Sequence, residues 1–288
     1  MRILRAAHLG MCFGVRDAIA LALTHADMGP LTILGDLVHN PTVLSALEAK
    51  GIATAADVAE VTTAMVMVTA HGASERTLAR TRALGLTVIE ATCPLVQVAH
   101  RAVAALARAG YHVIIIGKRD HVEVRGLTGD LDRFDVVLDA ADVLALEEHS
   151  RIGVAAQTTQ AMEKVLHLVG AIRKRFPRSD VRFVDTVCRP TKERQAAAID
   201  LAQQADVVIV VGGSSSNNTR ELVATCARYC QRVHQVQTDT DVRAEWFEGA
   251  NVVGLTAGTS TPDEVIDRVE LRVRELGAPI SGGVKELR

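Results

Sequence analysis

The stretch LTVIEATCPLVQVAHRAVAALA, residues 86–107, contains the pattern that decides the fold. An apolar, β-branched run ends at Cys93, and an Ala- and Leu-rich segment with helical periodicity begins after it at Pro94. The stretch therefore predicts a short strand, a cysteine and an amphipathic helix. The chain has no CxxC pair, so local metal-ligand spacing does not explain a cysteine at a strand end.

The same pattern occurs twice more. MRILRAAHLGMCFGVRDAIALAL at residues 1–23 contains Cys12, and VRFVDTVCRPTKERQAAAIDLA at 181–202 contains Cys188. A second apolar run follows each cysteine, as TILGDLVHN, VIIIGKRDHVE and VVIVVGGSSSNN. The polar residues that end these runs lie 27, 28 and 28 positions past their cysteines: His39, His121 and Ser216. This agreement in spacing indicates an internal repeat.

A third apolar run closes each repeat, as MVMVTAHG, IGVAAQTT and VVGLTAGTS. Each places a polar residue at its end: His71, Thr158 and Ser260. Strands that alternate with helical segments favour right-handed βαβ crossovers and parallel sheets. We therefore predict three tandem α/β units with small parallel sheets, at residues 1–92, 93–187 and 188–288, the last with a C-terminal tail. If they pack around a pseudo-threefold axis, their inner edges surround a central cavity. Polar residues at the carboxyl ends of the strands would face that cavity.

Composition and charge exclude several classes of function. The net charge is −2 with 3% aromatic residues, and the sequence has no basic stripe, which argues against a nucleic-acid partner. No apolar stretch approaches 18 residues, and the first residues, MRILRAA, resemble a strand rather than a signal peptide. We expect a soluble, cytoplasmic protein without a membrane partner that binds a small ligand.

Three cysteines at equivalent positions point to shared chemistry. They could bind zinc together with a histidine, hold an iron–sulfur cluster with one iron left open, or only pack. We favour the cluster, because a structural zinc site usually has four ligands with local spacing, whereas three thiolates leave one iron free as a Lewis acid. Cys226 and Cys230 lie outside the repeat register in the predicted helix TRELVATCARYC, and we expect both to pack in the core.

The polar residues at the strand ends suit a phosphorylated ligand. Imidazole, hydroxyl and amide groups can all donate to phosphate, and main-chain amides of the Gly212-Gly213 turn would add to them. Without GxxxxGK[ST], the loop GGSSSNN is not a nucleotide P-loop, and an ordinary capped turn explains it equally well. Glu123, two residues past His121, is a candidate proton donor.

In this order and spacing, a set of short motifs resembles the 4-hydroxy-3-methylbut-2-enyl diphosphate reductase (LytB/IspH) family over nearly the whole chain. The motifs are GMCFGVRDAI, LVHN, TAHG, EATCPLV, HVEVRG, QTT, DTVC, SSNNTRE and TAGTSTP. The resemblance implies a 4Fe-4S cluster held by Cys12, Cys93 and Cys188 at the centre of a trefoil, with an open iron that receives the allylic hydroxyl of the substrate. It implies a reductive dehydroxylation that gives isopentenyl and dimethylallyl diphosphate, the last step of the non-mevalonate pathway of isoprene biosynthesis.

The resemblance also implies roles for the other site residues. Glu123 would deliver protons, Thr158 would orient the hydroxyl end of the substrate, and electrons would come from a ferredoxin or flavodoxin. The diphosphate would be held by His39, His71, His121, Ser216, Asn218 and Ser260.

The chain departs from the family pattern at three places. The family's GGKNSSNT reads GGSSSNNT here, so a lysine is lost and a serine becomes Asn217, which can still donate to phosphate. Ala156 stands where threonine is usual, and Arg189-Pro190 follows the third cysteine. Two alternatives therefore stay open: a divergent iron–sulfur enzyme for another phosphorylated alcohol, and a non-catalytic iron–sulfur redox sensor.

Overall fold

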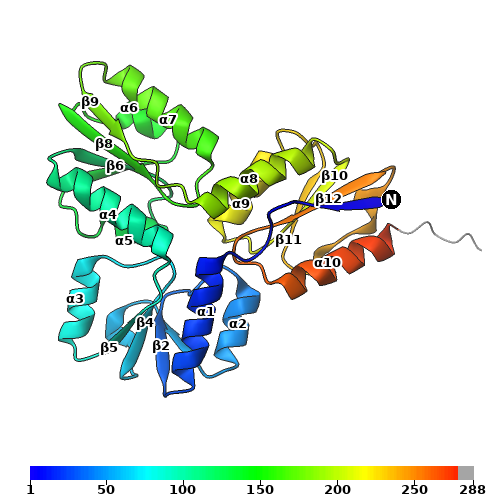
Figure 1. The fold of residues 1–288 in the computed structure, drawn as a ribbon, viewed down its shortest axis with the longest axis horizontal. Helices are drawn as coiled ribbons and strands as arrows, with labels where there is room; N and C mark the ends of the chain where they lie inside the picture. The colour runs from blue at the N-terminus through cyan, green and yellow to red at the C-terminus, as the bar shows by residue number, and fades with distance from the viewer. Residues whose placement is uncertain (278–288) are drawn as a thin grey trace, which may run out of the picture.

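The strands form three parallel, four-stranded sheets within residues 1–277, the part of the chain that the computed structural model describes. Figure 1 shows the result as three lobes around a centre, each a sheet flanked by helices. The predicted fold class, three α/β units with small parallel sheets arranged as a trefoil, is confirmed. No helix in the described part of the chain is long and apolar enough to cross a membrane.

The elements follow one another in the same way in each lobe. The first lobe contains α1 (Phe13–Ala26), β2 (Leu31–Leu34), α2 (Pro41–Glu48), β3 (Ala53–Ala55), η1 (Val58–Glu60), β4 (Met65–Val68), α3 (Glu75–Ala83) and β5 (Thr87–Glu90). The second contains α4 (Pro94–Arg108), β6 (His112–Ile116), α5 (Val122–Thr128), β7 (Phe134–Val137), α6 (Ala140–Ala145), β8 (Arg151–Ala156), α7 (Met162–Arg175) and β9 (Asp180–Phe183). The third contains α8 (Arg189–Ala202), β10 (Val207–Val211), α9 (Asn217–Cys226), β11 (Val233–Val236), η2 (Asp239–Asp241), η3 (Ala244–Phe247), β12 (Val252–Ala257) and α10 (Asp263–Leu276), joined by β1 (Arg2–Arg5).

The three sheets share one strand order, and this order positions the site. The orders are β3-β2-β4-β5, β7-β6-β8-β9 and β11-β10-β12-β1. In the first two sheets the first strand is followed by the neighbour on one side, and the third strand by the neighbour on the other side, where the third sheet has β1. The loops that leave these two strands therefore run in opposite directions, and a crevice opens between them. All of the polar strand-end residues predicted to be functional follow these first and third strands.

The N-terminal strand corrects the predicted boundaries. Residues 1–92 were expected to form the first unit, but β1 pairs in parallel with β12, from Arg2 opposite Val252 to Arg5 opposite Leu255. Both figures show the N-terminus beside β12. The reason lies in the repeat itself. β5 and β9 each complete the sheet that precedes their cysteine, and around a closed ring the sheet that precedes Cys12 is the third one.

Both faces of each sheet are covered, which explains the continuous apolar strands. β10 reads VVIVV, and all five of its residues are buried. The third lobe has one apolar cluster on each side of its sheet, one of which includes Cys226 and Cys230. Both cysteines pack as expected, although α9 ends at Cys226 and Cys230 lies in the turn beyond it.

Candidate active site

Each of the three repeated cysteines is the N-cap of a helix: Cys12 of α1, Cys93 of α4 and Cys188 of α8. Their main-chain N–H groups donate to equivalent carbonyls just past the third strand of each sheet. The distances are 3.0 Å from Cys12 to Thr259, 3.1 Å from Cys93 to Ala70 and 3.0 Å from Cys188 to Thr158. For Cys93 and Cys188 this hydrogen bond continues the parallel pairing of the preceding strand in register. For Cys12 the pairing resumes after two extra residues between Ala6 and Gly10, so in all three lobes the third strand of the sheet fixes the backbone position of the cysteine.

The three thiols are free, and the charge of Cys12 acts on both of the others, so the three lie near one another. Burial raises the pKa of Cys93 and of Cys188, the latter to about 11, and charge on Cys12 raises both further. Gly14 on α1 leaves the space that the Cys93 sulfur occupies, because any Cβ at position 14 would overlap it. Three soft donors at helix N-termini, in a site where neutral thiols are otherwise preferred, fit a metal centre that keeps them ionised.

Three histidines from the first two lobes cluster together. His39 and His71 stack with ring centroids 4.6 Å apart, and His121 meets them edge-on at 4.9 and 5.4 Å. The Nε2 atoms of His39 and His121 are 3.2 Å apart. Burial lowers the pKa of all three rings, for His121 to about 3. The cluster is therefore neutral at physiological pH.

The helix cap fixes the tautomer of His121. Its Nδ1 accepts a hydrogen bond of 3.1 Å from the main-chain N–H of Glu123 and so caps α5. In a neutral imidazole the other nitrogen then carries the proton. His121 therefore presents an Nε2–H donor, which the free Nε2 lone pair of His39 accepts in this structure and which an anionic ligand could accept instead.

The polar residues from the three lobes line one inner cavity of about 40 Å³. This volume holds about three water molecules, so a larger ligand must displace side chains or separate the lobes to enter. The lining residues predicted from sequence are His39, His71, His121, Ser216, Asn217, Asn218 and Ser260. Val15, Val38, Thr159 and Thr259 complete the lining.

Asn218 leaves one unused donor in this cavity. Its Oδ1 accepts a hydrogen bond of 3.0 Å from the main-chain N–H of Thr259, while its buried Nδ2 has no partner within the described residues. A buried amide without a partner is destabilising unless a ligand or water satisfies it. Asn217 differs, since its Nδ2 donates to the carbonyl and hydroxyl of Thr159 at 3.3 and 3.2 Å and ties the third lobe to the second.

Glu123 and Thr158 form a separate pair that lines neither cavity described here. The main-chain N–H and the hydroxyl of Thr158 donate to the two carboxylate oxygens of Glu123 at 2.6 and 3.0 Å. Glu123 is 1% exposed, and burial raises its pKa to about 7 although both hydrogen bonds favour the ionised form. Charge on Glu123 also raises the pKa of Cys93 and Cys188, after burial, so the carboxyl lies near the thiols.

At two positions the structure changes, by one residue, which residues of the three repeats are equivalent to one another. The caps of α2, α5 and α9 are Asn40, His121 and Ser216, so the equivalent of His121 in the first lobe is Asn40, 28 residues past its cysteine, and His39 precedes it. The loops after β4, β8 and β12 share one turn, from residues 69 to 72, 157 to 160 and 258 to 261. Thr159, rather than Thr158, is therefore equivalent to His71 and Ser260.

Sequence reasoning missed Arg194, which lies on α8 six residues past Cys188. Its buried guanidinium donates to the Gly10 carbonyl from Nε at 3.1 Å and from Nη2 at 2.7 Å. Burial lowers the pKa of Arg194, and charge on Cys12 and Cys188 opposes that shift. A buried cation beside two thiols suits an anionic centre. The sequence gives no local signal for this role, because Arg194 contacts Gly10, a residue 184 positions earlier in the chain.

A second group of metal-ligand residues lies apart from this site, at the other end of the second sheet. His112 Nε2 is 2.8 Å from Asp135 Oδ2, and the His149 ring stacks on His112 with centroids 3.8 Å apart and an interplanar angle of 11°. Parallel stacked rings cannot both direct a nitrogen at one ion without turning. This group therefore forms a polar pair with a stacked ring rather than a formed metal site.

Comparisons with known proteins agree with this geometry. The sequence matches the family described as LytB protein over residues 3–274. It is 36% identical over 278 residues to a 4-hydroxy-3-methylbut-2-enyl diphosphate reductase of Pelobacter propionicus, covering 96% of this chain and 99% of that protein. It is 38% identical over 276 residues to the protein of the same name from Geobacter sp. strain M21, covering 93% and 97%.

Two solved structures have the same architecture. The E-1-hydroxy-2-methyl-but-2-enyl-4-diphosphate reductase from Plasmodium falciparum superposes with a TM-score of 0.89 at 25% identity, covering 99% of this chain and 94% of that one. A structure of (E)-4-hydroxy-3-methyl-but-2-enyl diphosphate reductase gives 0.68 at 35% identity, covering 95% and 99%. The match spans all three lobes and every motif of the site, and the chain belongs to the LytB family.

Proposed function

We propose that this protein reduces 4-hydroxy-3-methylbut-2-enyl diphosphate to isopentenyl and dimethylallyl diphosphate, the last step of the non-mevalonate pathway. Two electrons and two protons are consumed, the allylic C–O bond breaks, a C–H bond forms and water leaves. One observation carries the proposal: donors from all three lobes line a single small cavity, and the loops that contribute Thr259, His71 and Thr159 to its lining also accept the main-chain N–H groups of the three cysteines. Full-length relatives with this named activity support it.

Cys12, Cys93 and Cys188 hold a 4Fe-4S cluster in this proposal, as the family resemblance implies. Bound there, the cluster supplies an open iron as a Lewis acid and a path for electrons. The chain contributes the three sulfur positions through the helix N-caps, and a hydroxyl beside one of them, since Thr191 Oγ1 lies 3.1 Å from Cys188 Sγ. The buried guanidinium of Arg194 balances negative charge near Cys12 and Cys188.

The diphosphate is bound by neutral donors. His121 offers Nε2–H and Asn218 its unpartnered Nδ2, and the hydroxyls of Ser216 and Ser260 and the imidazole of His71 add to them. His39, whose Nε2 accepts from His121 without a ligand, joins the donors in its Nε2–H tautomer. Neutral donors preorganised in a buried cavity can stabilise an anion because the low local dielectric strengthens each hydrogen bond. Asn217 acts mainly on the loop of Thr159, which holds two lobes together.

Glu123 delivers the proton and Thr158 orients the hydroxyl end of the substrate. With its pKa raised to about 7 by burial, the carboxyl is protonated in a large fraction of molecules at neutral pH. Thr158 holds both oxygens of that carboxyl and so fixes its direction. Electrons arrive one at a time from an external carrier of the ferredoxin or flavodoxin type.

The test is turnover by anaerobically loaded protein with the named substrate and a chemical reductant such as dithionite with methyl viologen. We expect both isoprenoid diphosphates as products, and a cluster-loaded protein that forms neither would contradict the proposal. Asn218→Asp is the informative variant, because it keeps the shape but replaces the free donor with a charge that repels phosphate. KM should rise at least about tenfold while the iron content stays unchanged.

A further inference from the structure

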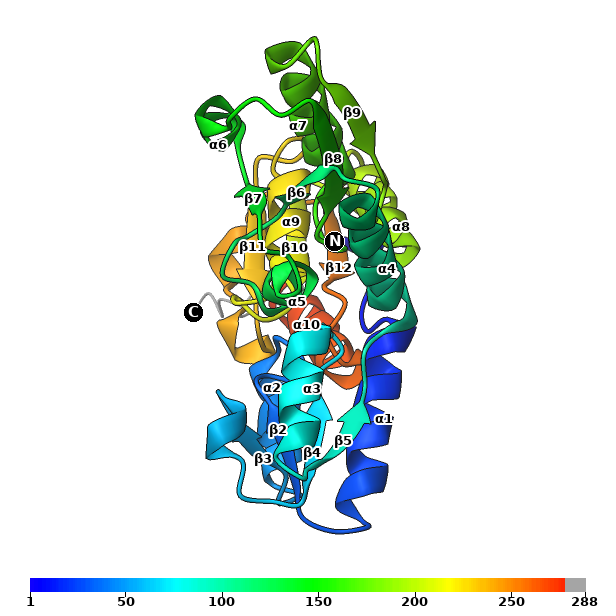
Figure 2. The same ribbon diagram turned by 90° about the vertical axis from the view of Figure 1, so that its left-hand side faces the viewer.

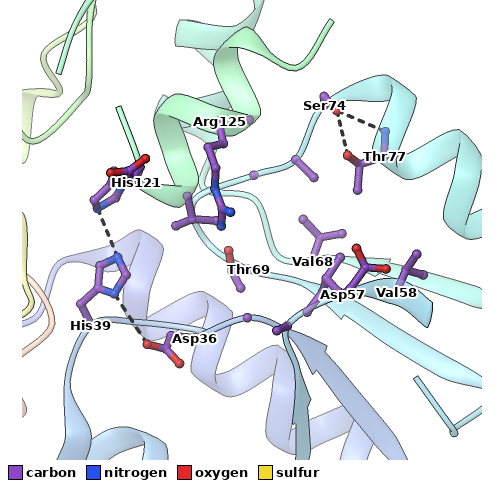
Figure 3. Close-up of a pocket in the computed structure, with 18 of the residues that line it drawn as sticks. Asp36, His39, Asp57, Val58, Val68, Thr69, Ser74, Thr77, His121 and Arg125 are labelled. Carbon is purple, nitrogen blue, oxygen red and sulfur yellow. Dashed lines mark hydrogen bonds and ion pairs between the residues drawn. The ribbon is translucent and has the colours of Figure 1, made fainter. Parts of the chain in front are cut away.

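A second, larger cavity of about 720 Å³ lies outside the histidines, lined mostly by the first and second lobes and also by Ser215 and Arg220 of the third. Figure 3 shows it bordered by His39 and His121 on one side and by Val58, Ser74 and Thr77 on the other. His39 and His121 also line the inner cavity, so their rings form the boundary between the two spaces. A ligand that reached the inner cavity from this side would pass these two rings.

The inner cavity has no formal positive charge. No lysine or arginine is among its lining residues, and burial keeps its three histidines neutral. Hydrogen bonds from neutral groups can hold a diphosphate that has already arrived. They exert little long-range attraction on a multiply charged anion in water. Moving such an anion into a buried site also costs free energy, because part of its hydration is removed.

The outer cavity contains that missing charge. Lys118, Arg125 and Arg220 line it and form no ion pair within residues 1–277. A fourth lining cation, Arg80, lies 3.6 Å from Asp57 and is therefore neutralised. Asp36 and Asp120 are the remaining acidic lining residues, so cations are in excess.

The three free cations are grouped around the boundary histidines. Lys118 lies three residues before His121, Arg125 is on the next turn of α5, and Arg220 is on the first turn of α9, whose cap is Ser216. In Figure 3 the Arg125 side chain extends from α5 into the cavity toward Thr69. The positive charges of all three lower the pKa of His121 further, after the larger effect of burial, which places each within electrostatic reach of that ring.

We propose that the outer cavity is the entrance for the anionic substrate, and that Lys118, Arg125 and Arg220 attract its diphosphate to His39 and His121. This inference rests on the proposed function, since it names how the substrate of that site arrives. It separates two tasks. The neutral donors of the inner cavity give geometry and the charges of the outer cavity give the rate of capture, because electrostatic attraction acts mainly on association.

The first experiment measures kcat and KM of the cluster-loaded protein from 0.05 to 0.5 M KCl. Lys118→Gln, Arg125→Gln and Arg220→Gln should each lower kcat/KM by about threefold to tenfold at the lowest salt and leave kcat within about twofold. The deficit should shrink as salt screens the charge. Arg119→Gln is the matched control, because this substitution removes the same charge one residue from Lys118. Arg119 itself lies outside the cavity, and its Nη2 donates to the Val136 carbonyl at 3.3 Å.

The second experiment needs no turnover, and so separates this inference from the proposed function. Binding of inorganic diphosphate to the loaded protein is measured by calorimetry in 0.05 M KCl. Weaker binding by the three variants than by Arg119→Gln supports the entrance even if the named substrate is not reduced. The inference is overturned if the wild type binds no diphosphate, if the three variants match Arg119→Gln, or if their loss is confined to kcat and insensitive to salt.

Discussion

Two sets of helices begin at the site, and their first residues are used in opposite ways. The helices α1, α4 and α8 are capped by Cys12, Cys93 and Cys188, none of which makes a side-chain capping hydrogen bond. The helices α2, α5 and α9 are capped by Asn40, His121 and Ser216, and each of these side chains accepts a main-chain N–H of its own helix.

The difference shows how one repeat serves two kinds of chemistry. In the first set the side chain that would normally cap the helix is left free, so sulfur can bond to something outside the chain. In the second set the cap satisfies the helix and fixes the side chain in one orientation, so only its remaining atoms face a ligand. Metal ligation needs the first arrangement, and preorganised donors for an anion need the second.

The largest expected effect falls on the cysteine caps. We expect anaerobically prepared protein to contain about four irons per chain, as the proposed 4Fe-4S cluster requires. Cys12→Ser, Cys93→Ser or Cys188→Ser should each remove most of this iron. Iron analysis and the visible absorption of the cluster measure this. Cys226→Ser is the control, because this buried thiol packs in the third lobe and donates weakly to the Ala198 carbonyl. Iron loss in the control alone would show that the wrong cysteines have been identified.

Glu123→Gln should have the next largest effect, on rate alone. The amide keeps the shape of the carboxyl but has no titratable proton, so turnover should fall by about a hundredfold to ten-thousandfold with the cluster spectrum intact. Because burial raises the pKa of Glu123 to about 7, its proton-donating form predominates below pH 7 and is lost above it. Wild-type kcat should therefore decrease as pH rises through 7. A variant with near-normal turnover at saturating substrate would assign the proton to another group.

A pair of substitutions at His121 separates ligand binding from capping. Serine can still cap α5, whereas alanine cannot, and both lack the Nε2–H donor. His121→Ser and His121→Ala should therefore raise KM by similar factors, about tenfold. Only the alanine variant should also lose about 1 kcal/mol of unfolding free energy, measured by denaturant titration. If the two variants were equally stable, the His121 cap would contribute nothing to stability. The claim that capping side chains satisfy the second set of helices would then fail for α5.

Much of this arrangement was predictable from sequence because it depends on spacing. The distances of 27, 28 and 28 residues from Cys12, Cys93 and Cys188 gave the fold class and brought the polar strand ends together. Spacing could not decide which of two adjacent residues caps a helix, which is why Asn40 and Thr159 were overlooked as the equivalents of His121 and His71.

Other features depend on how distant segments pack. The pairing of β1 with β12 follows from closing the ring, which no local pattern shows. The positions of Arg194 and of the three free cations in the outer cavity likewise arise only when separate lobes meet. A charged residue near a motif looks like ordinary solvated surface until the surrounding walls are known.

The smallest effect on activity is expected at Asn40, the first-lobe counterpart of His121. Its Oδ1 accepts hydrogen bonds from Thr42 at 3.0 Å and from Val43 at 3.4 Å, and Asn40 lines neither cavity. Asn40→Ala should therefore lower the unfolding free energy by about 1 kcal/mol, while Asn40→Ser, which can still cap α2, should lose only a few tenths. KM should stay within about twofold in both, because in the proposed site the ligand contact beside this cap is made by the preceding residue, His39. If Asn40→Ser raised KM as much as His121→Ser does, position 40 would be a ligand contact, and capping and binding would not be divided between neighbouring residues in this lobe.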